Sequence, residues 1–410
     1  MPESIPAEVR EQLASLAKES QLDVLGGRVR RSSSRFCLGV EHGDYNGTEL
    51  FGVGTDRFIW LAYKPNDSGR VRLKSANFPE DGLIDFPVDQ PPAPGEAPDS
   101  WARFPYGVSY ILGREGHKLT GGFDAVLYGN IPGGGMSRSA SLALNLIETF
   151  LECSGIEGVT GMPVVELAKA VENDYIGSPC GNLDQIMIYF AKAGMGTHYK
   201  PSDGSIDHVP LPETAEEFRL VSLDTGTVRP GLEKSTYKIR AQECAEMATL
   251  CRERFGIQTL GDVKTEEQYQ AIRDAFNDAK PNLVKRLKYI YEAQQRFDTM
   301  LDAWRRGDLT TVGQVFRQDG YGLRDDYEIS GPELEAMCEI ARTVPGVLGE
   351  RMLGGGDKGA SGAIVKPGAV DALRAAVNEQ YPERCPEFAG KQNVHSCSVV
   401  DGLTLCEGLD

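Results

Sequence analysis

Apolar side chains recur at the spacing of a helix in several stretches of the chain. Residues 8–19 place Val9, Leu13 and Leu16 on one side, which is typical of an amphipathic helix. The same periodicity predicts further helices over residues 141–153, 164–173, 234–255, 266–279 and 284–305. The second half of the chain is therefore predicted to be rich in helices.

Runs of strand-forming residues stand between these stretches. Strand candidates are residues 36–63, 123–128 and 218–223. A chain of 410 residues is too long for one ordinary core, so we expect two domains. A Pro-rich and acidic segment, residues 210–217, is a natural boundary and divides the chain into residues 1–217 and 218–410.

The amino-acid composition argues against some classes of binding partner. A formal net charge of −17 and a pI near 4.9 argue against a nucleic-acid partner, because phosphate backbones are bound by basic patches. The one basic cluster, residues 28–35, is either a solvated turn or a rim that attracts a phosphorylated small molecule. No stretch approaches the ~18 apolar residues of a membrane-spanning helix, and no apolar leader opens the chain.

The nine cysteines are an odd number, with neither a Cys-x-x-Cys pair nor a histidine at zinc-finger spacing. This usage fits reduced thiols in the cytoplasm. We therefore expect a cytoplasmic protein that binds neither nucleic acid nor membrane, and its oligomeric state stays open.

The segment from Arg35 to Gly47 brings together a cation, two carboxylates, an imidazole, a phenol and an amide. Such a mixture is poor core material, since unsatisfied buried polar groups are costly. A polyhydroxylated ligand such as a sugar would satisfy these groups, and Asn46 with Gly47 would form the tight turn that orients them. The alternative is an Asx-type turn on a solvated surface loop.

Three glycine-containing segments are further candidate sites. The strand candidate 123–128 leads into three glycines and then into serines at a helix start, which favours either a bound anion or an ordinary capped helix. Segment 177–185 places Asp184 just after a rigid turn, as a general base or a helix cap. Segment 351–362 is only a weak dinucleotide motif, because no apolar strand is expected before it.

Together these four segments resemble the motifs of the galactokinase branch of the GHMP small-molecule kinases. Residues 35–46 are similar to the signature Arg-Val-Asn-Leu-Ile-Gly-Glu-His-Thr-Asp-Tyr-Asn, and residues 132–140 to the phosphate loop Pro-x-Gly-x-Gly-Leu-Ser-Ser-Ser-Ala. Residues 179–185 are similar to Pro-Cys-Gly-Ile-Met-Asp-Gln, and residues 354–359 to Gly-Gly-Gly-Phe-Gly-Gly. Four motifs in this order make the match specific.

The resemblance implies an α+β fold of two domains, a ribosomal-S5-like N-terminal domain and an α+β C-terminal domain, with the active site in the cleft between them. It implies an ATP-dependent kinase that phosphorylates the anomeric hydroxyl of D-galactose. Asp184 would accept the proton of that hydroxyl. Arg35 would keep Asp184 ionised and stabilise charge on the transferring group.

The same resemblance assigns the remaining site residues. Sugar hydroxyls would be oriented by Glu41, His42, Asp44, Gly181 and Tyr237. The nucleotide would be bound by Trp101, Gly133, Gly134, Gly135, Ser137, Arg138, Ser139 and Ala140. Mg²⁺ would be bound by Ser139 and Glu172. Packed aromatics remain the alternative for Tyr237 and Trp101, and a solvated helix face remains the alternative for Glu172.

The chain departs from the family pattern mainly around the nucleotide. Three serines replace Ala-Pro-Gly before the signature arginine, and Cys37 replaces an asparagine. The phosphate loop is one residue shorter and carries Arg138 in place of a serine, while Asp357 and Lys358 replace Phe-Gly. Arg138 and Lys358 would then either contact phosphate or face solvent.

Three functions are compatible with these residues. The first is ATP-dependent phosphorylation of galactose in galactose metabolism, and the second is a related kinase for N-acetylgalactosamine or a sugar such as arabinose. The third is a sensor that binds sugar and nucleotide with little catalysis. The sequence does not decide between the sugars, because pocket walls built from distant residues make that discrimination.

Overall fold

The computed structural model describes residues 3–228 and 235–409. Its helices are α1 (Ala7–Ser20), α2 (Arg103–Arg114), α3 (Arg138–Cys153), α4 (Met162–Ala170), α5 (Leu183–Tyr189), α6 (Thr236–Phe255), α7 (Glu266–Phe276), α8 (Pro281–Arg306), α9 (Leu309–Asp325), α10 (Pro332–Thr343) and α11 (Val370–Arg384). Its strands are β1 (Arg28–Gly39), β2 (Leu50–Asn66), β3 (Arg70–Ser75), β4 (Ile84–Pro87), β5 (Gly122–Gly129), β6 (Met195–Lys200), β7 (Ser205–Pro210), β8 (Arg219–Asp224), β9 (Val347–Met352), β10 (Ala360–Val365), β11 (Asn393–Cys397) and β12 (Thr404–Cys406). The structure is thus a mixed α+β protein, as expected.

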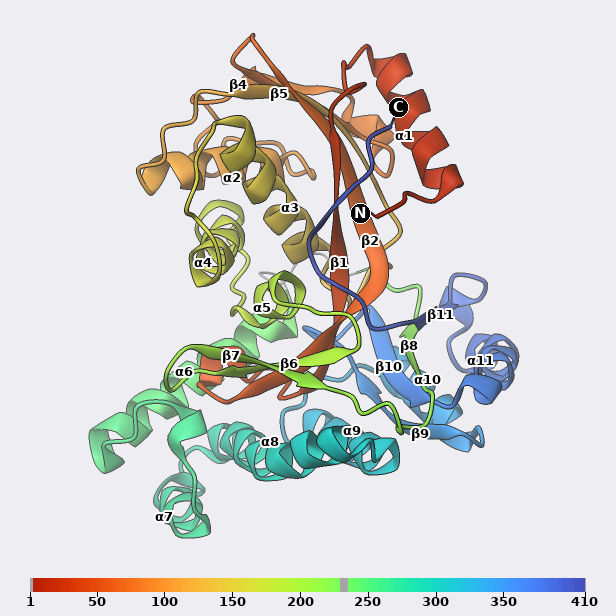
Figure 1. Ribbon diagram of the computed structural model, residues 1–410. Coiled ribbons are helices and arrows are strands. Elements are labelled where there is room, and N and C mark those ends of the chain that lie inside the picture. The colour runs from red at the N-terminus through yellow and green to blue at the C-terminus, as the bar shows by residue number, and fades with distance from the viewer. Residues whose placement is uncertain (1–2, 229–234, 410) are drawn as a thin grey trace.

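The larger sheet has eight strands among the described residues, in the order β12-β1-β2-β5-β3-β4, with β6 paired to β2 and β7 to β6. Alternate side chains of β2 face opposite sides of this sheet. Leu61 and Tyr63 join the core under α2 and α3, whereas Trp60 and Ala62 pack with α1. Figure 1 shows α1 on one side of the sheet and α2 and α3 on the other.

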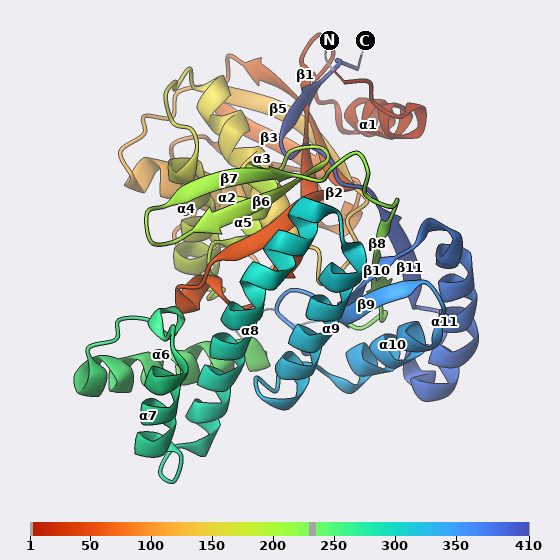
Figure 2. The ribbon, with the colours of Figure 1, turned by 60° about the horizontal axis from the view of Figure 1, so that its bottom comes forward.

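The smaller sheet has four strands, in the order β11-β8-β10-β9, and every pairing in it is antiparallel. Val221 and Ala363 face a core that contains residues of α10 and α11. The neighbouring Leu220 and Ile364 face the main core, to which α8 and α9 contribute. Figure 2 shows α8 and α9 to the left of this sheet, α11 to its right and α10 below it.

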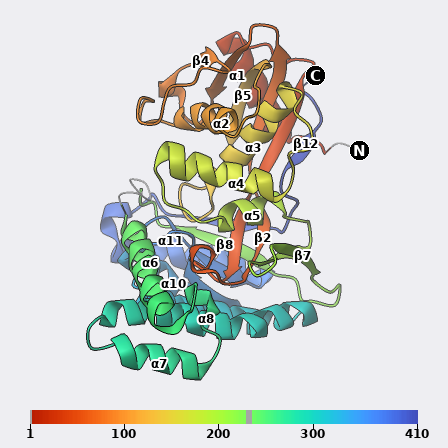
Figure 3. The ribbon, with the colours of Figure 1, turned by 90° about the vertical axis from the view of Figure 1, so that its left-hand side faces the viewer.

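The long strands β1 and β2 of the larger sheet run from the upper half of the molecule into the lower half (Figure 1). Figure 3 shows α2 to α4 in the upper half and α6 to α8 in the lower half. The proposed division at residues 217 and 218 falls between β7 and β8 and stays a prediction. The C-terminal strand β12 comes after this division in the chain but pairs with β1, so it belongs to the larger sheet.

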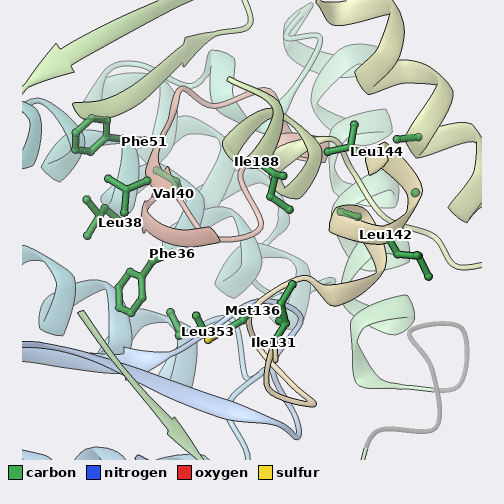
Figure 4. Close-up of a cluster of buried hydrophobic side chains, with 14 of the residues drawn as sticks. Phe36, Leu38, Val40, Phe51, Ile131, Met136, Leu142, Leu144, Ile188 and Leu353 are labelled. Carbon is green, nitrogen blue, oxygen red and sulfur yellow. The ribbon is translucent and has the colours of Figure 1, made fainter. Parts of the chain in front are cut away.

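A continuous core lies where the two halves meet. Phe36 and Leu38 of β1 belong to the same buried cluster as Met136, in the loop before α3, and Leu353, just after β9. Figure 4 shows these side chains gathered around the lower end of β1. The same hydrophobic core therefore anchors both the glycine loop before α3, residues 133–137, and the last glycine segment, residues 354–359.

Two expectations about polar segments are wrong for the same physical reason. Residues 28–35 form most of β1 instead of a solvated turn, and β9 precedes the last glycine segment where no strand was expected. Distant carboxylates neutralise the arginines in both strands: Arg30 pairs with Glu152 at 2.5 Å, and Arg351 with Glu41 at 3.0 Å. Partners so far away in the chain are invisible to a local hydrophobic pattern.

The helix expectations are largely confirmed, since α1, α3, α6, α7 and α8 lie on the predicted stretches. No helix in the described part of the chain is long and apolar enough to cross a membrane.

Candidate active site

A cavity of about 400 Å³ lies between the two halves of the molecule. Its wall includes Arg35 of β1, the glycine loop before α3, the start of α5, Tyr237 of α6 and Gly354 of the last glycine segment. Among the residues that the sequence assigns to the site, only Ala140 is absent from the wall, because its side chain is buried within α3. Segments from both halves of the chain therefore build one site.

Arg35 and Asp184 form the central ion pair of this cavity. Arg35 is 2 % exposed, and its Nε and Nη2 atoms each lie 2.7 Å from Oδ1 of Asp184. Its Nη1 donates to the carbonyl oxygen of Gly135, which ties the pair to the glycine loop. Asp184 stands in the first turn of α5, and 32 % of its side chain is exposed. The carboxylate is held on one side and accessible from the cavity on the other.

Two acids of the signature follow β1 at the same end of the cavity. The carboxylate of Glu41 is buried and accepts a hydrogen bond from Nη1 of Arg351. The carboxylate of Asp44 accepts from the backbone N–H of Leu183 at 3.1 Å. Burial raises the pKa of Asp44 to about 6, against the opposing effect of the Leu183 hydrogen bond. Each acid is thus held by a protein donor and borders the cavity.

Gly181 is required by the position of Asp44. A Cβ atom added at Gly181 would lie 2.0 Å from Oδ2 of Asp44, well inside any real contact distance. The turn between η3 (Val171–Ile176) and α5 therefore presses bare backbone against the carboxylate.

Aromatic side chains close this end of the cavity. The imidazole Nδ1 of His42 lies 2.9 Å from the hydroxyl of Tyr45, which lies 2.7 Å from the hydroxyl of Tyr327. The ring of Tyr237 is centred 5.3 Å from that of His42, and Tyr237 is 6 % exposed. Sequence reasoning missed Tyr327, since it follows α9 and belongs to no motif. We call this end of the cavity, with Glu41, His42, Asp44, Gly181 and Tyr237, the sugar half, after the ligand that the sequence predicts for it.

Glu172 and Ser139 lie together on the other side of Asp184. Glu172 is 5 % exposed, shares a hydrogen bond with the Ser139 hydroxyl and accepts another from Nε2 of Gln185 at 3.0 Å. Burial, together with the charge of Asp184, raises the pKa of Glu172 to about 7. The alternative of a solvated helix face is therefore wrong for Glu172. The residue lies in the π-helical turn η3, which buries its side chain.

The oxygen atoms of Ser139 and Glu172 suit a hard cation. No cluster of three or more His, Cys, Asp or Glu ligands occurs within residues 3–228 and 235–409. Mg²⁺ does not need one, because it commonly binds one carboxylate, waters and substrate phosphates. The buried Oε1 atom of Gln185, next to Glu172, has no hydrogen-bond partner in the protein. The residues therefore fit a magnesium site that a phosphate ligand completes.

The glycine loop is packed tightly against the last glycine segment. A Cβ atom at Gly134 would lie 2.3 Å from Cα of Gly359, so the two backbones touch. The expectation that serines cap α3 is wrong: Ser137 occupies the N-cap position at φ 58° and makes no side-chain cap. A left-handed residue lacks the extended geometry that capping needs. The Ser137 hydroxyl consequently has no partner in the protein.

The opposite end of the cavity is aromatic and basic. The rings of Phe78 and Trp101 are centred 6.5 Å apart at an interplanar angle of 20°, and the guanidinium of Arg138 lies 5.5 Å from the centre of the Phe78 ring. Sequence reasoning missed Phe78, which stands in no motif. Lys358 lies outside the cavity wall and pairs with Glu333 at 3.0 Å. We call this end, with Phe78, Trp101, Ser137 and Arg138, the nucleotide half, after the ligand that the sequence predicts for it.

Comparisons with known proteins point in one direction. Residues 104–192 match the family model described as the GHMP kinases N terminal domain. Galactokinase from Enterococcus faecalis is 32 % identical over 380 residues, which cover 90 % of this chain and 92 % of that protein. A crystal structure of Lactococcus lactis galactokinase complexed with galactose superposes with a TM-score of 0.85 and 29 % identity, covering 95 % of this chain and 99 % of that one. Mevalonate kinase from Methanococcus jannaschii shares the fold alone, with a TM-score of 0.63 and 14 % identity.

Proposed function

Because this chain belongs to the galactokinase family of the GHMP kinases, we propose that it transfers the terminal phosphoryl group of ATP to the anomeric hydroxyl of D-galactose. The arrangement that carries this proposal is the Arg35–Asp184 pair, which borders the cavity between a polar half and an aromatic half. Phosphoryl transfer needs in-line positioning and compensation of charge more than covalent chemistry, and this arrangement suits both needs.

In this proposal Asp184 is the base. Its accessible carboxylate accepts the proton of the anomeric hydroxyl while that oxygen attacks the terminal phosphorus of ATP. The bond between phosphorus and the bridging oxygen breaks, and ADP leaves. Arg35 holds Asp184 in place and offers positive charge beside the phosphoryl oxygens.

The sugar half supplies recognition. Glu41 and Asp44 accept hydrogen bonds from sugar hydroxyls, and His42 with Tyr237 provides the wall against which the ring lies. Glu41 is fixed by Arg351 and Asp44 by Leu183, so little ordering remains when a sugar binds.

The nucleotide half and the glycine loop receive ATP. The loop from Gly133 to Ser137 presents backbone N–H groups at the start of α3, where an anion is favoured. Ser139 and Glu172 would hold Mg²⁺. When bound, the ion neutralises charge on the phosphates. Both residues adjoin Asp184, whose negative charge contributes to the raised pKa of Glu172.

We place the enzyme in the cytoplasm on the basis of its cysteines. All nine are free, and seven of them are buried. Burial raises the pKa of Cys37 and Cys180, both close to the site, which keeps these thiols protonated and inert.

A coupled assay of ADP release with a panel of sugars tests the proposed function. We expect galactose to give the highest kcat/KM, ahead of N-acetylgalactosamine, arabinose and glucose, in the presence of Mg²⁺ and ATP. Absence of ADP release with all four sugars would overturn it, and calorimetric binding of galactose without turnover would identify a sensor instead.

A further inference from the structure

Arg138 differs from the other arginines that line the cavity. Arg35 pairs with Asp184, and Arg103 pairs with Asp99 at 3.0 Å. Arg138 is exposed in the cavity wall, and no carboxylate among the described residues forms an ion pair with it. Neighbouring protein atoms remove part of its water, and this partial desolvation lowers the pKa of the guanidinium against the opposing charge of Asp224. A cation in this situation favours an anionic ligand.

The direction of the Arg138 side chain is set by Phe78. The guanidinium rests over the Phe78 ring, whose other neighbour is the stacked ring of Trp101. The next residue, Ser139, points elsewhere, because its hydroxyl shares a hydrogen bond with Glu172. Consecutive helical residues diverge by about 100°, so the first turn of α3 presents a metal side and a guanidinium side. A phosphate chain bound above the glycine loop would lie between them.

The two sides differ in their distance from the chemistry. Glu172 and Ser139 belong to the side of Asp184, where the transferred group must lie. Arg138 belongs to the side of Phe78 and Trp101, where the nucleoside lies in the proposed function. Resting on this proposed function, we propose that Arg138 binds the nucleoside-proximal phosphates that ATP and ADP share, and not the phosphoryl group that is transferred.

The chemistry of the side chain suits this role. A guanidinium presents a planar fork to two phosphate oxygens, and stacking on Phe78 fixes the fork before the ligand arrives. The glycine loop is also one residue shorter than the family pattern, so Arg138 adds donors where the backbone offers fewer. An interaction that substrate, transition state and product share lowers KM but leaves kcat unchanged. It also retains ADP, which makes this enzyme sensitive to product inhibition.

Substitution of Arg138 tests the proposal on the full-length enzyme. We compare Arg138→Ser, Arg138→Lys and, as a control that removes the same charge, Arg114→Ser at the end of α2. Arg114 pairs with Asp174 and does not line the cavity. Calorimetry without sugar gives the Kd of ATP and of ADP, each with Mg²⁺, and steady-state kinetics give kcat, KM and the inhibition constant of ADP.

We expect Arg138→Ser to weaken ATP and ADP by the same factor, ~10- to 100-fold, as for a lost charge-assisted hydrogen bond. The ADP inhibition constant should rise by that factor and kcat should stay within about twofold, because the interaction is uniform. The Kd values of Arg138→Lys should lie between those of the parent enzyme and those of Arg138→Ser. The Kd values of Arg114→Ser should match those of the parent enzyme.

Unchanged Kd values would overturn the proposal, as would weakening of ATP alone or a fall in kcat at constant KM. The nucleotide Kd values need no sugar turnover. A wild-type enzyme that binds ATP through Arg138 but phosphorylates no sugar would therefore refute the proposed function and not this inference.

Discussion

The two halves of the cavity are prepared for their ligands in different ways. In the sugar half each acid already has a protein donor, as in the contacts of Glu41 with Arg351 and of Asp44 with Leu183. In the nucleotide half the Ser137 hydroxyl and the indole N–H of Trp101 have no hydrogen-bond partner, and among the described residues Arg138 has no ion-pair partner. The sugar half is preorganised, whereas the nucleotide half is completed by its ligand.

This difference separates the expected effects of substitutions. In the sugar half, a change leaves a buried charge without its partner and so alters both the geometry and the free energy of unfolding. In the nucleotide half, a change removes only what the ligand would have used, so affinity changes and stability does not. The following substitutions probe that contrast, from the largest expected effect to the smallest.

Substitution of the proposed base should have the largest effect. Asp184→Asn keeps the shape of the side chain and a hydrogen-bond acceptor for Arg35 but cannot take the proton. We expect kcat to fall by ~10²- to 10⁴-fold, with the Kd of galactose little changed. Single-turnover kinetics and calorimetry measure the two quantities, and Asp302→Asn on the exposed side of α8 is the matched control. Turnover within tenfold of the parent would remove Asp184 from the chemistry.

Glu172 lies between the two halves and should make stability depend on pH. Its pKa is raised to about 7 by burial and by Asp184, so the folded state holds a proton that the unfolded state has released. The stability from this group is therefore complete below its ordinary pKa near 4.5 and is lost as pH rises through 7. Asp44, with a pKa of about 6, adds a change of the same sign.

Glu172→Gln should remove the share of that pH dependence that comes from Glu172 and leave the share that comes from Asp44. Without metal, we expect the variant to be more stable than the parent at pH 8 by about 3 kcal/mol and nearly equal to it at pH 4.5. Urea denaturation at the two pH values measures the difference. Equal pH profiles for variant and parent would show that Glu172 is not a strained, buried acid. Mg²⁺-dependent turnover should fall in the variant at every pH.

Gly181→Ala should damage the sugar half through Asp44. The added methyl group has no room beside Oδ2 of Asp44, so the carboxylate must move, and kcat/KM for galactose should fall by at least ~10-fold. The Kd of ATP should be unaffected. Gly113→Ala in α2 is the control, because its Cβ would meet no atom within 4 Å. Loss of ATP affinity instead of galactose affinity would contradict the division into halves.

Lys358→Ala should have the smallest effect. The amine pairs with Glu333, away from the cavity wall, and 32 % of its side chain is exposed. We expect KM for ATP to change by less than about twofold, while stability falls because the buried carboxylate of Glu333 loses its partner. Steady-state kinetics decide this, and a large rise in KM would restore Lys358 as a phosphate ligand.

The sequence motifs predicted that Arg35, Glu41 and Asp184 lie close together, and the structure places all three in the wall of one cavity. Each of these residues lies in a short segment at a defined place in the fold. Arg35 is in β1, Glu41 follows β1 and Asp184 is in the first turn of α5, so a local motif is enough to identify each one. What holds them was not predictable. Arg351 is 310 positions from Glu41, and its place on β9 was hidden because buried ion pairs interrupt the apolar pattern of that strand.

The nucleotide half was predicted less completely. Trp101, Arg138 and the glycines were identified, but Phe78 was not, because an aromatic residue outside any motif is indistinguishable from core. The sequence also did not show whether Lys358 contacts phosphate or faces solvent, because the carboxylate that pairs with it, Glu333, belongs to the distant helix α10. A site that is completed by its ligand has fewer contacts between protein residues. Fewer of its residues therefore stand at a fixed spacing that a sequence motif can reveal.

The position of the new phosphate ester tests the account most directly. The wild-type enzyme is incubated with Mg²⁺, ATP and galactose labelled with ¹³C at C1, and the product is followed by ³¹P and ¹³C NMR. With Asp184 as the base for the anomeric hydroxyl, all product should show coupling between phosphorus and the labelled C1. Phosphate on any other carbon, or no phosphorylated sugar, would contradict the account.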